Sequence, residues 1–259
     1  MTSLRKSLSA ILLAASAAAF AVSPYPQLEL KANRYFSQRE WAQAAATYDL
    51  MLDERPRVAR TYGRAIVAGR MAGDTIAAAR LFDMALDHHV PFDSVFANVR
   101  STSFGLGRSD LYERFLLDIK GEHPWMRRTV NSYLLRYYEF RRDGPNMTAY
   151  ADIMLQGSPD NIGFLSTKAQ GEMLTGNADM AAATYRRVLE LDPANYNALL
   201  ELGNLYAMRA AKTAGPEAEG LRQLAAGYLR RAFEIRPTPG VEATLASLET
   251  PPEGKKQSR

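Results

Sequence analysis

Apolar residues recur at helical spacing along most of the chain, in pairs of segments separated by a short turn and followed by a proline. Residues 165–193 show the pattern clearly. A first segment ends at Thr175-Gly176-Asn177, and a second segment runs through Ala181, Tyr185 and Val188 before it stops at a proline. Runs of alternating Val, Ile and Thr, which are typical of strands, are missing. The pattern predicts helical hairpins and no sheet.

The prolines that end these hairpins recur at a nearly fixed period. They are Pro56, Pro91, Pro124, Pro159 and Pro193, at intervals of 35, 33, 35 and 34 residues, and Pro237 follows after 44. A period of this length is typical of repeat proteins, in which each hairpin buries its apolar stripe against its neighbours. We interpret the longer last interval as a lengthened turn within 208–223. We expect about six hairpins and a short capping helix at 241–249.

Small residues mark the places where the two helices of a hairpin would cross. They are Ala44, Ala78, Ala181 and Ala225, each followed four residues later by an aromatic residue or Leu. Residues four apart lie on the same helical face, so the small residue allows a close approach and the larger one fills the groove beside it.

The sixth hairpin carries the most specific signature. It consists of Leu199, Leu202, Gly203 and Tyr206 in the first helix and Ala225, Leu229, Ala232 and Pro237 in the second. With these residues the chain resembles the tetratricopeptide repeat (TPR) family, whose unit is a helix-turn-helix of 34 residues. The resemblance covers most of 25–237. It is weaker in the third hairpin, where Tyr112 occupies the small position, and in the fourth, where Arg142-Asp143-Gly144-Pro145 replaces the tight turn.

The resemblance implies an all-α fold, a right-handed α-solenoid over 25–249 followed by a polar tail at 250–259. It also implies that the first helix of each hairpin lines a concave groove that binds a protein or peptide, without a cofactor. By register with the prolines, the expected groove residues are Asn33, Arg60, Arg64, Asn98, Arg128, Asn131, Gln170, Asn197 and Asn204. Amides bond to peptide backbone and arginines bond to carboxylates, so this set suits an extended segment with carboxylates. The alternative interpretation is that these residues are simply the polar lining of a solvated groove.

The first residues are typical of an export signal. Arg5 and Lys6 precede an apolar run from Ala10 to Val22, and Ala19-Phe20-Ala21 offers a cleavage site, which predicts a signal peptide over 1–21. Its removal would lower the formal charge from +4 to +2. We therefore expect a periplasmic or secreted protein, an adaptor or scaffold of the bacterial cell envelope, and a membrane-associated complex is compatible with this. An uncleaved leader would instead give a cytoplasmic or inner-membrane-anchored adaptor.

Other functions find little support in the sequence. Basic residues are not clustered in a nucleic-acid-binding module, and the chain has no cysteine. The segment 104–107 resembles the start of a phosphate loop but lacks its later glycine, and His88-His89 belongs to no metal-binding motif. We interpret Asp152 and Glu172 as solvated, and the aromatic residues at 133–140 as core rather than as a sugar platform. The prediction is a protein that is not an enzyme and needs no metal or small-molecule cofactor; a subunit that handles cell-wall glycan or peptide is the weaker alternative.

Overall fold

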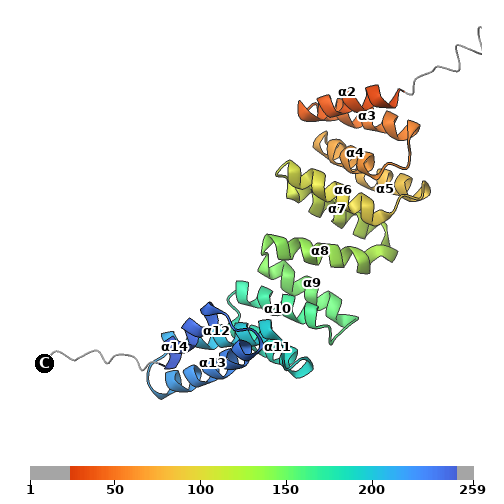
Figure 1. Cartoon of the computed structure of the whole chain (residues 1–259). Coiled ribbons are helices and arrows are strands. Elements are labelled where there is room, and N and C mark those ends of the chain that lie inside the picture. The colour runs from red at the N-terminus through yellow and green to blue at the C-terminus, as the bar shows by residue number, and fades with distance from the viewer. Residues whose placement is uncertain (1–23, 250–259) are drawn as a thin grey trace, which may run out of the picture. The chain divides into compact units, whose positions relative to one another are not determined.

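The computed structural model describes residues 24–249, and they form an all-helical structure (Figure 1). Within this range no residue belongs to a strand. The predicted leader at 1–21 and the predicted tail at 250–259 lie outside the described residues.

The described residues form six consecutive helical hairpins and one final helix. The hairpins pair α2 (Tyr25–Ser37) with α3 (Trp41–Glu54), α4 (Ala59–Met71) with α5 (Ala77–Asp87), α6 (Phe92–Gly105) with α7 (Ser109–Glu122), α8 (Arg127–Arg141) with α9 (Gly144–Gln156), α10 (Ile162–Leu174) with α11 (Ala178–Leu191), and α12 (Tyr196–Lys212) with α13 (Pro216–Ile235). The last helix is α14 (Pro239–Glu249), which packs on α13 as the predicted capping helix. A short 3-10 turn, Pro124–Met126, precedes α8.

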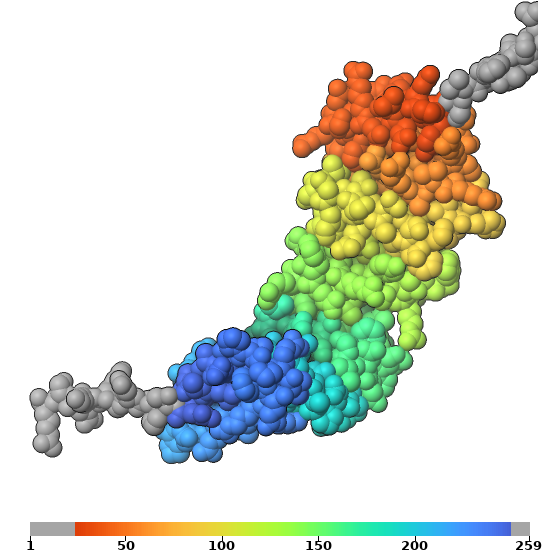
Figure 2. Space-filling view, in the orientation of Figure 1, coloured from red at the N-terminus to blue at the C-terminus, as the bar shows by residue number. Residues whose placement is uncertain are grey.

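The hairpins belong to two compact units that divide between Pro124 and Trp125. The first unit contains the first three hairpins, α2 to α7, and the second contains α8 to α14. Within each unit, side chains fill the spaces that the ribbons leave between neighbouring helices (Figure 2).

The periodic prolines and glycines have the predicted structural roles. Each of the six prolines follows the second helix of a hairpin. Gly73, Gly107 and Gly176 make the tight turns with φ values of 93°, 69° and 79°, a conformation in which a side chain is unfavourable. The fourth hairpin turns without glycine, because Arg142 takes this conformation with φ 53° and Asp143 caps α9 by accepting from the backbone N–H of Asn146.

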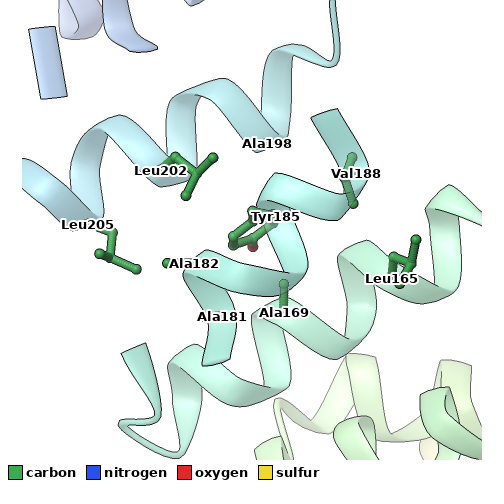
Figure 3. Packing of buried hydrophobic residues seen from close by; sticks show 9 residues of the cluster. All are labelled: Leu165, Ala169, Ala181, Ala182, Tyr185, Val188, Ala198, Leu202 and Leu205. Carbon is green, nitrogen blue, oxygen red and sulfur yellow. The ribbon is translucent and has the colours of Figure 1, made fainter. Parts of the chain in front are cut away.

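The close crossings also lie where they were predicted. Ala44, Ala78, Ala181 and Ala225 are all fully buried. The larger residues four positions later, which are Tyr48, Phe82, Tyr185 and Leu229, are buried as well. Figure 3 shows the second-unit example, in which Tyr185 lies at the centre of an apolar cluster from α10, α11 and α12. The mutual burial of these apolar faces stabilises the stack of hairpins.

Two expectations about local structure were wrong. The extra residues of the sixth hairpin lengthen both helices, since α12 continues to Lys212 and α13 begins at Pro216. The turn between them is therefore short. In the aromatic segment of α8, Tyr137 and Tyr138 are buried as predicted, but Phe140 is 61% exposed because it lies on the opposite face of the helix.

Candidate functional site

The first helices of the first unit surround a hollow of about 320 Å³. Its lining comes from α2, α4 and α6 and from the residue that follows α6, and consists of Phe36, Arg60, Arg64, Asn98, Ser101, Thr102, Gly105 and Leu106. Three of the predicted groove residues, Arg60, Arg64 and Asn98, thus lie around a single hollow. A fourth, Asn33, is hydrogen-bonded to Arg64.

Arg64 is the best-oriented cation of this hollow. Its Nη1 donates to Oδ1 of Asn33, and its Cζ lies 6.0 Å from the centroid of the Phe36 ring. Both neighbours hold the guanidinium in place, and neither neutralises its charge. Arg64 has no carboxylate partner among residues 24–249. Its positive charge is therefore available to an anionic group of a ligand.

Arg60 lies beside Arg64 on α4 but carries a partner. Its Nη2 donates to Oε1 of Glu29 at 2.7 Å, and the Arg60 side chain is 61% exposed. An exposed pair of this kind contributes little to stability, so a competing carboxylate can replace Glu29 at low cost.

Gly63 determines how closely α6 approaches α4. A Cβ atom on Gly63 would lie 2.6 Å from Cβ and 2.7 Å from the carbonyl carbon of Asn98. Asn98 Nδ2 donates to the backbone oxygen of Ser94 at 2.8 Å, which fixes the amide along its own helix. The glycine therefore allows Asn98 to lie next to the two arginines of α4.

The second unit has a separate hollow of about 470 Å³. Its lining consists of Glu139, Arg142, Met147, Gln170, Met173, Leu174, Tyr185 and Glu201. Gln170 is the one predicted groove residue in this lining.

The remaining predicted groove residues lie elsewhere in the second unit. Arg128 donates through Nη2 to Oγ of Ser158 at 3.2 Å, just beyond the C-terminal end of α9. Asn131 is buried, at 7% exposure, so its amide is not presented to solvent. Asn197 is exposed and Asn204 is half-buried, and both belong to α12.

Unpartnered polar groups distinguish the second hollow. Glu201 is half-buried, and no hydrogen-bond or ion-pair partner is found for its carboxylate within 24–249. Burial raises the pKa of the Glu201 carboxyl. The hydroxyl of Tyr185 is buried without a hydrogen-bond partner. Burial raises the pKa of Tyr185, and the charges of Glu201 and Glu172 raise it further. These groups are ready to bond to a ligand.

Glu172 corrects a prediction made from the sequence. It is 1% exposed rather than solvated, and its Oε2 accepts a hydrogen bond from Thr184 Oγ1 at 2.8 Å. Lys168 Nζ lies 4.0 Å from the other oxygen and 2.7 Å from Oδ1 of Asp152. Burial raises the pKa of Glu172, and the Thr184 hydrogen bond and Lys168 oppose the rise. Glu172 thus links α10 to α11 within the core.

The histidines and the glycine-rich segment 104–107 lie at helix ends and in the turns that follow them. His88 comes directly after the last residue of α5, and His89 follows with φ 59°. His123 lies with Nε2 3.4 Å from Asp83 Oδ1 and its ring against Phe82. Gly107 makes the turn after α6. Throughout residues 24–249, no three His, Asp or Glu side chains are grouped in a way that could hold a metal ion.

No helix between residues 24 and 249 combines the length and the apolar character that a membrane crossing requires.

Comparison with known proteins gives structural likeness only. No family model and no curated protein sequence matches the chain. Among solved structures, the chain is similar to the C-terminal part of a TPR repeat-containing protein from Cytophaga hutchinsonii, at 14% identity and TM-score 0.45, over 87% of this chain and 96% of that one. A TPR protein from Bacteroides fragilis is 15% identical with TM-score 0.39, over 88% and 98%.

A third similar structure is the TPR2AB domain of yeast Sti1 in complex with pHSP90, at 12% identity and TM-score 0.38, over 88% of this chain and 99% of that one. Similarity at this level of identity concerns the fold and gives no information about the function. The description of this chain as TPR-like hairpins rests on its own turns, crossings and prolines.

Several residues of the two hollows were not predicted from the sequence, among them Phe36, Glu139, Tyr185 and Glu201. A signal for Glu201 was present, since it lies four residues after Asn197 and three before Asn204 and so shares their helical stripe. Tyr185 carried no such signal, because its spacing is that of a core residue.

Proposed function

We propose that this chain is a protein-interaction module and that the hollow of the first unit binds a partner segment through a carboxylate. The observation that carries the proposal is the environment of the Arg64 side chain. Its guanidinium is held by Asn33 and Phe36, lines the hollow and has no carboxylate partner within 24–249. A guanidinium that is already oriented binds a carboxylate through two parallel hydrogen bonds with little loss of side-chain entropy.

The other residues of this hollow suit a peptide. Asn98, Ser101 and Thr102 carry amide and hydroxyl groups that can bond to a peptide backbone. Phe36 and Leu106 add apolar surface for a neighbouring side chain. We propose that the function is binding, without catalysis or a cofactor. Packed hairpins suit binding because they offer a preformed surface.

We further propose that the module works in the bacterial cell envelope as a scaffold or adaptor. The support is the leader pattern at 1–21. We expect the native protein to begin near Val22 and to be found outside the cytoplasm. Intact-mass measurement of protein from its own cells tests this, and a chain that still carries Met1 would contradict it.

The carboxylate site is tested by reversing the charge of Arg64. Peptides are selected on the full chain from a random display library, and their dissociation constants are measured with the wild type and with Arg64→Glu. We expect those that bind the first unit to carry Asp, Glu or a free C-terminus. Arg64→Glu should weaken their binding by about 1–3 kcal/mol, the range for losing a charge-assisted hydrogen bond.

The matched control is Arg80→Glu, which reverses a charge on α5 and disturbs only an exposed ion pair with Asp49. It should leave binding unchanged, and thermal unfolding should show that both variants stay folded. The carboxylate site is contradicted if Arg64→Glu binds all selected peptides as the wild type does, or if acidic groups are not enriched among them.

A further inference from the structure

The hollow of the second unit combines apolar walls with carboxylates. Met147, Met173 and Leu174 supply the apolar surface, and Glu139 and Glu201 supply two carboxylates from α8 and α12. Tyr185 of α11 contributes to the lining from the core side, where Figure 3 shows it among the buried residues of α10 to α12. This combination suits a side chain with a long apolar stem and a polar end.

The charge of this hollow favours a cation. The ionised groups in the lining are two carboxylates and one guanidinium, that of Arg142. Arg142 lies after the last residue of α8 with its side chain exposed, so water screens its charge. Glu201 is half-buried, where a charge is screened less. A cation that reaches Glu201 is therefore attracted more strongly than it is repelled by Arg142.

Two polar groups of this hollow, one half-buried and one fully buried, have no hydrogen-bond partner among residues 24–249. Oγ1 of Thr167 donates to Oε1 of Glu139, so that carboxylate is already oriented. By contrast, Glu201 has no bonding partner in the described part of the chain, and the Tyr185 hydroxyl is fully buried without one. A fully buried hydroxyl without a partner is rare and costly, and a ligand that supplies hydrogen-bond donors would satisfy it as well as the half-buried Glu201 carboxylate.

We propose that the second-unit hollow binds the side chain of one lysine or arginine from a partner protein segment. The methylene stem lies against Met147, Met173 and Leu174, as such stems do on apolar surfaces. The cationic end donates to Glu201 and Glu139, and the Tyr185 hydroxyl accepts from it or donates to Glu201. The inference rests on the proposed role as an interaction module, but it assigns a second site with the opposite charge preference.

Other occupants fit the hollow less well. An acidic side chain would be repelled by the carboxylates. An apolar side chain would remove water from the half-buried Glu201 carboxylate without giving it a partner, which costs binding free energy, and it would leave the Tyr185 hydroxyl unsatisfied as before. A cation satisfies both groups and uses the apolar walls as well.

The test is peptide selection on the full-length protein. The affinities of the selected peptides are then measured for the wild type and for two variants, Glu201→Gln and Arg64→Glu. Peptides that depend on the second unit should contain a required lysine or arginine. Their binding should weaken about tenfold or more with Glu201→Gln, as expected for loss of a charged hydrogen-bond partner. Replacing that lysine or arginine by norleucine or citrulline should weaken binding to the wild type to a similar degree. Arg64→Glu should leave these peptides bound.

Control variants separate binding from folding. Glu190→Gln removes the same charge from an exposed ion pair with Arg187 and should not change binding. Glu201→Gln should leave the unfolding temperature at pH 7 unchanged or higher, because a carboxyl with a raised pKa destabilises the fold where it is ionised. Tyr185→Phe keeps the buried ring, and we expect it to weaken binding about tenfold, as for loss of one hydrogen bond to a charged group, without lowering stability.

The outcomes distinguish the two sites. The second-unit site is overturned if no selected peptide requires a basic residue, or if basic peptides bind Glu201→Gln and wild type equally. Sensitivity of the basic peptides to Arg64→Glu alone would also overturn it, since they would then bind the first unit. The carboxylate site of the first unit is judged separately, from the acidic peptides and Arg64→Glu.

Discussion

Replacing Phe82 by alanine is expected to lower the free energy of unfolding by about 3–5 kcal/mol, the range for removing a fully buried aromatic side chain. Phe82 has no exposed surface. Its ring centroid lies 5.6 Å from that of Phe96, 6.2 Å from that of Phe115 and 5.3 Å from that of His123. The ring joins α5 to α6 and α7, so its loss opens a cavity between the second and third hairpins.

Chemical denaturation followed by circular dichroism measures this effect, and Phe140→Ala is its control. Phe140 is 61% exposed, so the same change there should alter the free energy of unfolding by less than about 0.5 kcal/mol. Equal effects of the two substitutions would contradict the assignment of Phe82 to a core that binds two hairpins together.

Most of the fold could be predicted because its determinants are local and repeated. A proline beyond the first turn of a helix interrupts it, and a small residue four positions before a large one indicates a close crossing. Ala44 and Ala181 lie far apart in the chain, yet both are fully buried for this same reason. The period of about 34 residues then sets the order of the hairpins.

The local features that were mispredicted depend on contacts rather than on spacing. The segment 208–223 contains Gly215 and Pro216, which are turn residues, but good helix formers on both sides extend the two helices up to them. The sequence predicts that Glu172 is solvated, because carboxylates usually lie at the surface. Its burial depends on Thr184 and Lys168, and Thr184 comes from the next helix.

The candidate site was predictable where helical register decides it. Asn33, Arg60, Arg64 and Asn98 come from three hairpins, and register alone placed them near one another in the first unit. In the second unit register was not enough. Asn131 falls on the buried side of α8, while Glu201 and Tyr185 line the hollow because of the depth at which α11 and α12 pack. Depth of packing cannot be obtained from a single sequence.

Replacing Gly63 by alanine is expected to lower the free energy of unfolding by about 3 kcal/mol, the upper part of the range for overpacking. The added methyl group would lie 2.6 Å from Cβ and 2.7 Å from the carbonyl carbon of Asn98. The backbone of α6 cannot turn away as a flexible side chain would, so α4 and α6 must separate. Denaturation in urea measures the loss.

The control is Gly227→Ala in α13, and the two substitutions should act in opposite directions. Gly227 is exposed, and a methyl group there meets no atom within 4 Å. Alanine at an unstrained helical site should raise the free energy of unfolding by about 0.5–1 kcal/mol, because the unfolded chain loses freedom. If Gly63→Ala also stabilises the protein, then α4 and α6 are not in the close contact described.

Gly63→Ala should also affect binding, although it changes no group that a ligand would contact. Arg60 and Arg64 lie on α4 and Asn98 lies on α6, so the width of the first-unit hollow depends on the distance between these two helices. Under conditions in which the variant is still folded, acidic peptides that depend on Arg64 should bind it more weakly than they bind Gly227→Ala. Unchanged affinity would mean that Arg64 binds the carboxylate without Asn98. The spacing of α4 and α6 therefore connects the packing of the first unit to its proposed function.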